Sequence, residues 1–516
     1  ASDAAVLLEQ GISSKLMMQQ CTVNKGEVKG LGGDLIVSDT DFNNDAPQVY
    51  IGSDARAILT GNRFAKKADI NNQSLFECRI DHTPVEMKPL PEFPEMKVPE
   101  TKPLRMALYN VLDFGAEPFV VPFTASSTSM WLQIDIRSGL EMAKDNTEAI
   151  QKALDKAASE GGGIVYLPGG RYKVLGNLTV PTGVELRGAT IPRGHGSILE
   201  VYAGRGQAQG EAFLKLSAGS GVRGLSFDYP EQVSSALPTV TEYPYCIQAL
   251  GKDVYVVNVG LRAAYNGLDL FTYKCDNHYV DYLAGHVFMN AIRIGGGSEG
   301  GRVCNMQFNT IVYACGEETK FGSWPNSAKA DQDKAYWQNQ TELRFITVGN
   351  CRNQILYNDF HYGGFEGIVF QADQGKAASG CSLGLGIDGS WNSVVYEALD
   401  PAGFDMINSQ VVALEDQSNT YTETRFLTTR AGFSGEVTLF GADFWGSAKH
   451  GVVVESGKMN LNLVNFSTSG GTSFMNFPKT TGTIVLHNAV VNMKDEAAFI
   501  SEGHEKQASV TSTVTD

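Results

Sequence analysis

Short strand-like runs recur along most of the chain, and each ends in an apolar residue that we interpret as an inward-facing anchor. Successive anchors are mostly about 22–27 residues apart, with longer intervals at insertions. A fixed period of this length is typical of a solenoid, and alternating β-branched residues inside each unit favour strands. The sequence therefore predicts a parallel β-helix. The anchors from the middle of the chain onward are Phe227, Leu261, Leu283, Phe308, Phe360, Ile387, Val411, Phe444, Phe466 and Val490.

Composition agrees with a turn-rich β protein and excludes several partners. Glycine makes up 56 of 516 residues, about 11%, whereas about 7% is typical. The 41 basic and 57 acidic residues give a net charge of −16, which argues against nucleic acid and anionic membranes as partners. No apolar run approaches the roughly 18 residues that a membrane-spanning helix needs. The eight cysteines form no C-x-x-C pair, so we expect mostly buried free thiols rather than a zinc ribbon or a disulfide framework.

The anchors also suggest how the chain is divided. Four further anchors, at Val23, Phe42, Phe64 and Ile80, indicate that residues 1–88 are coils of another β-helix-like module, the tail of a first module. Five prolines between Pro89 and Pro103 predict a stiff, extended linker over 89–104. We assign residues 105–500 to the main β-helix and 501–516 to a C-terminal tail.

A helix is predicted directly before the main array. Asp145 and Glu148 have the spacing of a capping box, and the apolar stripe that follows has helical spacing. The glycines at 161–163 end this helix, and Ile164 begins a strand.

Three segments carry a resemblance to a known family: Val111-Leu-Asp-Phe-Gly-Ala116, Asp145-Asn-Thr-Glu-Ala-Ile-Gln-Lys-Ala-Leu154 and Gly161-Gly-Gly-Ile-Val-Tyr-Leu-Pro-Gly-Gly-Arg-Tyr172. Together they resemble the start of pectate-lyase-like right-handed parallel β-helix proteins, although Glu117 to Lys144 is inserted here. The resemblance implies an all-β, right-handed solenoid over about 105–500 with an N-terminal capping α-helix. The tandem arrangement is similar to exo-β-1,3-glucanases built from two β-helices. The superfamily includes lyases, hydrolases, fructotransferases, epimerases and tailspikes, so the resemblance predicts fold rather than chemistry.

Two groups of polar residues are candidate catalytic sites, because the residue after an inward anchor faces outward. The first is Asp359, His361, Glu366 and Asp388, beside the longest insertion. Paired carboxyls cleave glycosidic bonds when they lie about 5–9.5 Å apart, a distance that neighbouring coils with a rise of about 4.8 Å can span. We prefer this first site slightly.

The second candidate site is Asp228 and Glu231, with Arg262 on the next coil and Tyr229 in the turn between the two carboxyls. Coil spacing places it on the order of 25 Å from Asp388, so the two sites are separate. Polar outward faces and a structural Tyr-Pro-Glu turn are the alternative interpretation of both groups.

Aromatic side chains near the insertions are candidate sugar platforms, because aromatic rings stack on the apolar faces of sugars. The alternative is that they pack against the flank of the solenoid. The candidates for substrate binding are Trp324, Tyr336, Trp337, Trp391, Tyr229 and Arg262.

We predict no cofactor and no catalytic metal. The run from Asp39 to Asp45 places carboxylates at alternate positions, and calcium is a weaker alternative there because the Gly and closing Glu of an EF-hand are missing. Among the histidines, a structural role is the simpler interpretation.

The leading prediction is a secreted or periplasmic glycoside hydrolase acting on a polysaccharide or oligosaccharide through paired carboxylates. A polysaccharide lyase acting on a uronate-containing glycan is the first alternative, and the acidic net charge counts against it. A non-catalytic glycan-binding solenoid, such as a tailspike or adhesin, is the second. The sequence leaves open the glycan, its linkage, endo or exo action, the stereochemical course and the oligomeric state.

Overall fold

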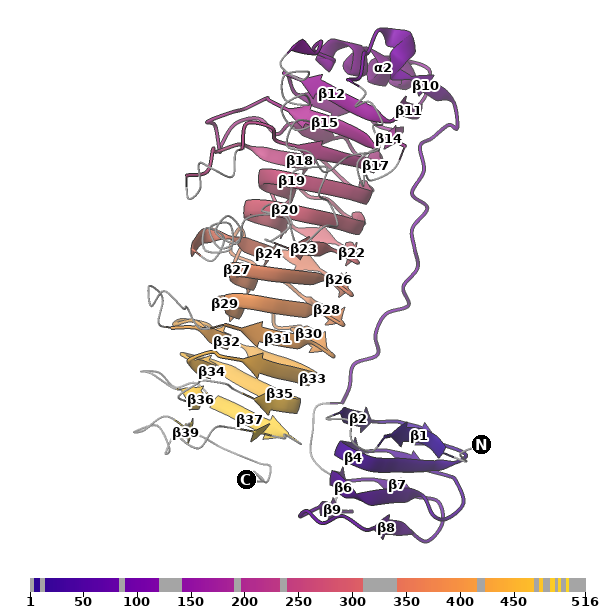
Figure 1. Cartoon of the computed structure of the whole chain (residues 1–516), viewed down its shortest axis with the longest axis vertical. Coiled ribbons are helices and arrows are strands. Elements are labelled where there is room, and N and C mark those ends of the chain that lie inside the picture. Colours follow the sequence, from indigo (N-terminus) through magenta and orange to yellow (C-terminus); the bar gives the residue numbers. More distant parts are fainter. Residues whose placement is uncertain are drawn as a thin grey trace, which may run out of the picture.

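The computed structural model describes residues 4–9, 14–82, 89–119, 142–189, 196–232, 239–309, 341–414, 423–467, 473–476, 483–487, 491–492 and 498–500. These residues form a long parallel solenoid, a smaller N-terminal module and an extended linker between them (Figure 1). Two helices lie wholly within the described residues, the α-helix α2 (Thr147–Ser159) and the 3-10 helix η1 (Val111–Phe114). No helix in it is long and apolar enough to cross a membrane.

The solenoid consists of three ladders of parallel strands, in which each strand pairs with one a coil later. The first ladder contains β10 (Leu108–Asn110), β11 (Gly163–Leu167), β14 (Val184–Gly188), β22 (Arg302–Cys304), β26 (Gln354–Tyr357), β28 (Gly380–Leu383), β30 (Phe404–Ile407) and β37 (Thr483–His487). The second contains β12 (Gly170–Val174), β15 (Ser197–Val201), β23 (Gln307–Asn309), β31 (Gln410–Ala413) and β38 (Val491–Asn492). The third contains β13 (Leu178–Val180), β16 (Leu214–Leu216), β18 (Tyr245–Ala249), β24 (Arg344–Val348), β32 (Arg425–Thr429), β34 (His450–Val454), β36 (Ser473–Asn476) and β39 (Ala498–Ile500).

Seven longer strands turn at least one corner. They are β17 (Gly221–Asp228), β19 (Tyr255–Leu270), β20 (Tyr279–Ile294), β27 (Phe360–Phe370), β29 (Gly386–Tyr396), β33 (Glu436–Gly446) and β35 (Lys458–Ser467). Strands β19 and β20 run through all three ladders, and the other five join two ladders. A short additional pair joins β21 (Ser298–Glu299) and β25 (Cys351–Arg352).

Asparagines form one edge of the solenoid, between the first and second ladders. Asn258, Asn305, Asn358 and Asn408 all have positive φ angles of 51–55°, a conformation that asparagine tolerates better than most residues. Asn358 donates to Asn305 Oδ1 at 2.8 Å, and Asn305 donates to Asp281 Oδ1 at 2.8 Å. The side chains therefore form a hydrogen-bonded ladder parallel to the solenoid axis.

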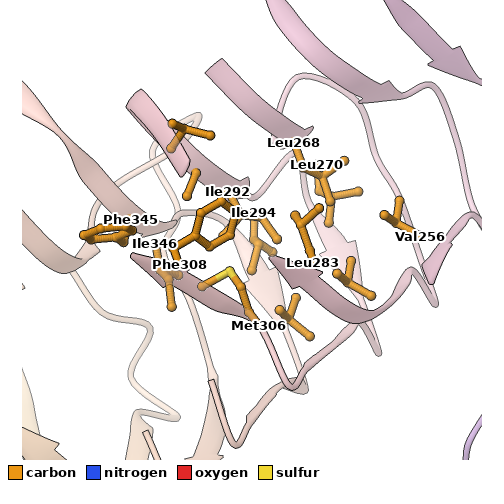
Figure 2. Packing of buried hydrophobic residues seen from close by; sticks show 14 of the residues in the cluster. Val256, Leu268, Leu270, Leu283, Ile292, Ile294, Met306, Phe308, Phe345 and Ile346 are labelled. Carbon is orange, nitrogen blue, oxygen red and sulfur yellow. The ribbon is translucent and has the colours of Figure 1, made fainter. Parts of the chain in front are cut away.

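Apolar side chains fill the interior as one continuous cluster along the described coils. Figure 2 shows Leu268, Ile292, Phe308 and Phe345 packed between the ladders. The seven described cysteines are free, and five of them are buried, as the sequence predicted.

Helix α2 lies at the end of the solenoid where the main array begins (Figure 1). Its apolar face, including Ile150 and Leu154, joins the core. The predicted capping box is wrong, because the N-cap is Asn146 and makes no side-chain cap bond. Asp145 instead accepts hydrogen bonds from the Thr147 backbone and hydroxyl at 3.0 and 2.6 Å.

The N-terminal module has parallel coils of its own. It contains β1 (Ala4–Leu8), β2 (Lys15–Gln19), β3 (Thr22–Val23), β4 (Glu27–Ser38), β5 (Asp41–Phe42), β6 (Val49–Thr60), β7 (Arg63–Phe64), β8 (Ile70–Asn72) and β9 (Arg79–Asp81). The anchors Val23, Phe42 and Phe64 are in register, as predicted, but Ile80 pairs with Leu59 instead. One hydrogen bond of 2.9 Å, from Asn462 of β35 to Gln19, connects this module to the solenoid.

The proline-rich linker runs along one side of the solenoid towards α2 (Figure 1). Met96 packs against a cluster of Tyr255, Tyr279 and Cys304 on the first ladder. Arg223 donates to the Thr101 carbonyl and hydroxyl, both at 2.9 Å. The linker is thus attached to several coils.

Candidate functional site

Strand register shows which residues face outward on the second ladder. The inward positions in register are Tyr172, Leu199, Phe227, Leu261, Gly285, Phe308, His361, Ile387, Val411 and Phe444, and the backbone register continues to Phe466 and Val491. The predicted anchor Phe360 is therefore wrong, because His361 takes its place, and Leu283 is buried as predicted but lies two places before the register position, which Gly285 occupies. The predicted anchor Val490 lies outside the described residues. Residues one place after the inward positions form an outward line that we call the second-ladder column. Its described members include Lys173, Glu200, Asp228, Arg262, Asn309, Tyr362, Asp388, Val412 and Trp445.

Two carboxyl groups of this column meet on one arginine. Glu200 Oε1 and Asp228 Oδ2 both contact Nη2 of Arg171, the latter at 2.9 Å. Arg262, on the next coil, approaches the same Asp228 oxygen at 3.2 Å. Two atoms within hydrogen-bonding reach of one nitrogen lie no more than about 6 Å apart. The structure therefore pairs Asp228 with Glu200, a residue that the sequence interpretation missed.

Burial sets the charge state of this pair. The Glu200 side chain has no exposed surface, whereas that of Asp228 is 12% exposed. Desolvation raises the pKa of Glu200 to about 8, and the nearby Arg171 opposes this shift only in part. Burial therefore favours the protonated form of Glu200 over its carboxylate. The pKa of Tyr202 is also raised, to about 12, by burial and by the charge of Glu200.

Glu231 lies at the outer side of this cluster. It accepts a hydrogen bond of 3.0 Å from the Tyr243 hydroxyl, and Arg205 approaches it at 3.4 Å. The Glu231 side chain is partly exposed, and that of Arg205 is largely exposed. Tyr229, which we expected to bind substrate, is buried against Tyr243 in an edge-to-face contact, so that prediction is wrong.

The first predicted site does not assemble. Asp359 and His361 are buried, contrary to the outward placement that the sequence suggested. Asp359 accepts a hydrogen bond of 2.8 Å from the Met306 backbone at a corner of the coil. His361 stacks on Phe345 at 4.1 Å, and burial lowers its pKa to about 3. One misplaced anchor explains the error, because shifting a strand by one residue exchanges its inner and outer faces.

Glu366 and Asp388 have different surroundings. Glu366 is buried and paired with Arg344, at 2.6 Å, and with Arg430. Glu366 lies four residues along β27 from Tyr362, the residue that pairs in register with Asp388, so the register does not bring the two carboxyl groups together. Asp388 faces outward on β29 beside Tyr362 of the preceding coil, and burial raises its pKa to about 6.

The predicted aromatic platform is not supported by the described residues. Trp391 is buried and packs edge-to-face on Phe365 at 6.2 Å, so it cannot stack on a sugar in this conformation. Trp324, Tyr336 and Trp337 lie outside the described residues.

The acidic run considered for calcium makes ion pairs instead. Asp41 pairs with Arg63 at 2.5 Å, and Asp45 pairs with Lys66. Among the described residues, no three His, Cys, Asp or Glu side chains gather as a metal site requires.

A sequence signal could have revealed Glu200. Leu199 precedes Phe227 by one coil in register and Tyr172 precedes it by two, so extending the anchor list backwards would have placed Glu200 next to Asp228 in the column. Arg171 carries no comparable signal, because its contacts depend on the reach of a side chain across two coils.

Comparisons with known proteins agree with this architecture. The family described as "Rhamnogalacturonase A/epimerase, pectate lyase-like" matches residues 141–203, which include α2, Arg171 and Glu200. A search of curated proteins finds no match. Among solved structures, the A-module of the mannuronan C-5 epimerase AlgE4 from Azotobacter vinelandii is similar with a TM-score of 0.50 and 14% identity, over 78% of this chain and 100% of that module.

Two further structures have lower scores. The DFA-IIIase of Arthrobacter chlorophenolicus A6 without its lid has a TM-score of 0.47 at 11% identity, over 79% of this chain and 99% of the other. The N-terminal fragment of bacteriophage Phi29 gene product 12 has a TM-score of 0.46 at 13% identity, over 78% of this chain and 65% of the fragment. The parallel ladders and the likeness to the AlgE4 module show that this chain has the right-handed parallel β-helix fold, and its residues 141–203 are similar to a pectate-lyase-like family.

Proposed function

We propose that the protein is a glycoside hydrolase that cleaves a polysaccharide or oligosaccharide with Glu200 and Asp228. The observation that carries the proposal is the contact of both carboxyl groups with one nitrogen of Arg171. The terms rhamnogalacturonase and epimerase in the description of the matching family are consistent with a glycan substrate. Such polymers lie largely outside the cytoplasm, so a secreted or periplasmic location fits this function.

The proposal gives the two carboxyl groups different roles, as acid and base chemistry requires. Burial favours the protonated form of Glu200, which donates its proton to the glycosidic oxygen as the C–O bond breaks. Asp228, held between two guanidinium groups, is the carboxylate that attacks the anomeric carbon. Water then displaces the sugar from Asp228 and returns its proton to Glu200. The close spacing of the pair favours retention of anomeric configuration.

Access to the pair is from the side of Glu231 and Arg205, whose side chains are the more exposed members of the cluster. Glu200 itself has no exposed surface. A substrate therefore reaches the proton of Glu200 only after a neighbouring side chain has moved. We expect Arg205 and Tyr202 to change position in a complex.

A polysaccharide lyase is the second candidate, favoured by one observation. With Glu200 neutral, the two guanidinium groups of Arg171 and Arg262 face the single negative charge of Asp228. The surplus positive charge would stabilise the carboxylate of a uronate while a base removes its neighbouring proton.

The test is incubation with neutral and acidic glycans, with reducing ends and unsaturated-uronate absorbance measured in parallel. New reducing ends without absorbance support hydrolysis, and absorbance on a uronate polymer supports the lyase. Glu200→Gln and Asp228→Asn should each lower turnover by about 10²–10⁴-fold. Glu185→Gln is the matched control, since Glu185 is equally buried and also contacts two arginines, Arg187 and Arg223, but lies on the first ladder.

The assignment would be overturned if neither new reducing ends nor unsaturated-uronate absorbance appeared, or if the Glu200→Gln and Glu185→Gln variants had equal turnover. If the parent protein hydrolyses a glycan, nuclear magnetic resonance of the first product reports its anomeric configuration. Inversion would contradict the role of Asp228 as nucleophile.

A further inference from the structure

The second-ladder column continues beyond the proposed catalytic pair. Leaving Arg262, it passes Asn309 and reaches Tyr362, Asp388, Val412 and Trp445 on successive coils. Asp388 lies five coils after Asp228, which at about 4.8 Å per coil is about 24 Å along the axis. The two groups are therefore on one line of the surface but too far apart to share a reacting atom.

Two aromatic side chains flank Asp388 on this line. Tyr362 is on the preceding coil, paired in register with Asp388, and its side chain is half-buried. Trp445 is two coils further on and is 38% exposed, the one tryptophan of the described residues with that much surface. Val412, between them, is buried and supplies an apolar floor.

The backbone beside Asp388 leaves room for the tyrosine ring. Gly389 has a positive φ of 70°, and a Cβ atom placed there would meet the Tyr362 ring at 3.2 Å. A side chain at position 389 would therefore press on the ring, and glycine allows Tyr362 to lie against the strand that carries Asp388.

The Asp388 carboxyl group is held in a partly desolvated place without an ion-pair partner among the described residues. Burial alone raises its pKa to about 6. A desolvated carboxylate between aromatic rings is suited to accept hydrogen bonds from ligand hydroxyl groups, while the rings cover apolar ring faces. Hydroxyl-rich rings are the defining chemistry of a glycan.

We propose that Tyr362, Asp388 and Trp445 form a second, non-catalytic glycan-binding site that holds a distant part of the same chain that is cleaved at Asp228. The column connects the two places along one ladder, with the buried His286 on the coil between Arg262 and Asn309, and an extended polysaccharide running along the solenoid axis contacts both. The identity of the ligand rests on the proposed function. The consequence is a preference for long substrates over short ones.

The test measures binding apart from hydrolysis. Affinity electrophoresis of Asp228→Asn in gels containing polygalacturonate, alginate, xylan or β-1,3-glucan reports binding without cleavage. Adding Trp445→Ala or Tyr362→Ala should weaken the retardation about tenfold, the effect expected of one lost aromatic contact. Tyr273→Ala is the matched control, because Tyr273 is 46% exposed and lies outside the column.

Kinetics separates this site from the proposed catalytic pair. In the otherwise unaltered protein, Trp445→Ala should raise the KM for the polymer about tenfold and leave the KM for a short oligosaccharide unchanged. If a glycan gel retards Asp228→Asn and the added Trp445→Ala substitution abolishes this retardation, the site is supported even if no hydrolysis is found. The proposal is overturned if no gel retards Asp228→Asn, or if Trp445→Ala and Tyr362→Ala bind as tightly as Tyr273→Ala.

Discussion

Replacing Glu200 by glutamine gives the sharpest test of the charge state on which the proposed chemistry depends. Glutamine has the shape of a protonated glutamate but neither gains nor loses a proton. If Glu200 is already neutral in the folded protein, the variant reproduces its native hydrogen-bonding state. If Glu200 is ionised and paired with Arg171, the variant removes a buried charge from an ion pair and leaves Arg171 to share Asp228 with Arg262.

The expected effect follows from the pKa of Glu200, about 8 in the folded protein against an ordinary value of 4.5. Between these values the folded chain keeps a proton that the unfolded chain has lost, so the free energy of unfolding falls as pH rises. The contribution is fully present below about pH 4.5 and is lost as pH passes about 8. Each pH unit in this window changes the free energy by at most about 1.4 kcal/mol, a few kcal/mol in all.

Thermal melts of the parent protein and of Glu200→Gln between about pH 5 and about pH 9 measure this directly. We expect the two proteins to be similar near pH 5 and the variant to gain on the parent as pH rises. Other buried acids such as Asp388 titrate in both proteins and cancel in the difference. A variant that is less stable than the parent by a constant amount across this range would show that Glu200 is ionised throughout, and the acid role would be refuted.

Three further predictions concern stability and the linker. His361→Leu should reduce the loss of stability that the parent shows as pH falls from about 6.5 towards about 3, because burial keeps His361 neutral, while His278 still contributes its share; acid titration followed by circular dichroism measures the difference. Asn358→Ala should cost about 1–2 kcal/mol in urea unfolding, since it puts a Cβ-bearing residue without side-chain hydrogen bonds at a positive φ and breaks the bond to Asn305, whereas Asn358→Gly should cost less. Met96→Asp should release the linker and speed its cleavage in limited proteolysis, and Val98→Asp, at a position that is 71% exposed, should not.

The solenoid was predictable because its period is written in the sequence many times over. Apolar residues recur at each coil, so one misassigned anchor does not change the fold. It does change the site, since His361 occupies an inward position that an apolar residue holds on the coils before and after, Phe308 and Ile387. A histidine in that place looks like an outward functional group to any reasoning based on residue type. Only the register of the neighbouring strands shows that it is packing.

The proposed site was less predictable for a different reason. Asp228 and Arg262 are neighbours in the column and follow from coil alignment alone. The link to Glu200 depends on Arg171, whose guanidinium group extends across two coils from a position that the repeat assigns to no special role. Periodicity places backbones, whereas the meeting of long side chains is decided by packing that no repeat encodes.

The distribution of charge along the column gives the two proposed sites different tasks. At its beginning, Glu200 and Asp228 on adjacent coils both contact Arg171, Arg262 follows on the next coil, and burial raises the pKa of Glu200 against the opposing effect of Arg171. Later coils carry aromatic and apolar groups, and burial raises the pKa of Asp388, which has no ion-pair partner among the described residues. Proton transfer needs two groups with opposed preferences at one place, and binding needs only one acceptor beside an apolar surface. The second-ladder column can therefore cleave a glycan at one end and bind it at the other.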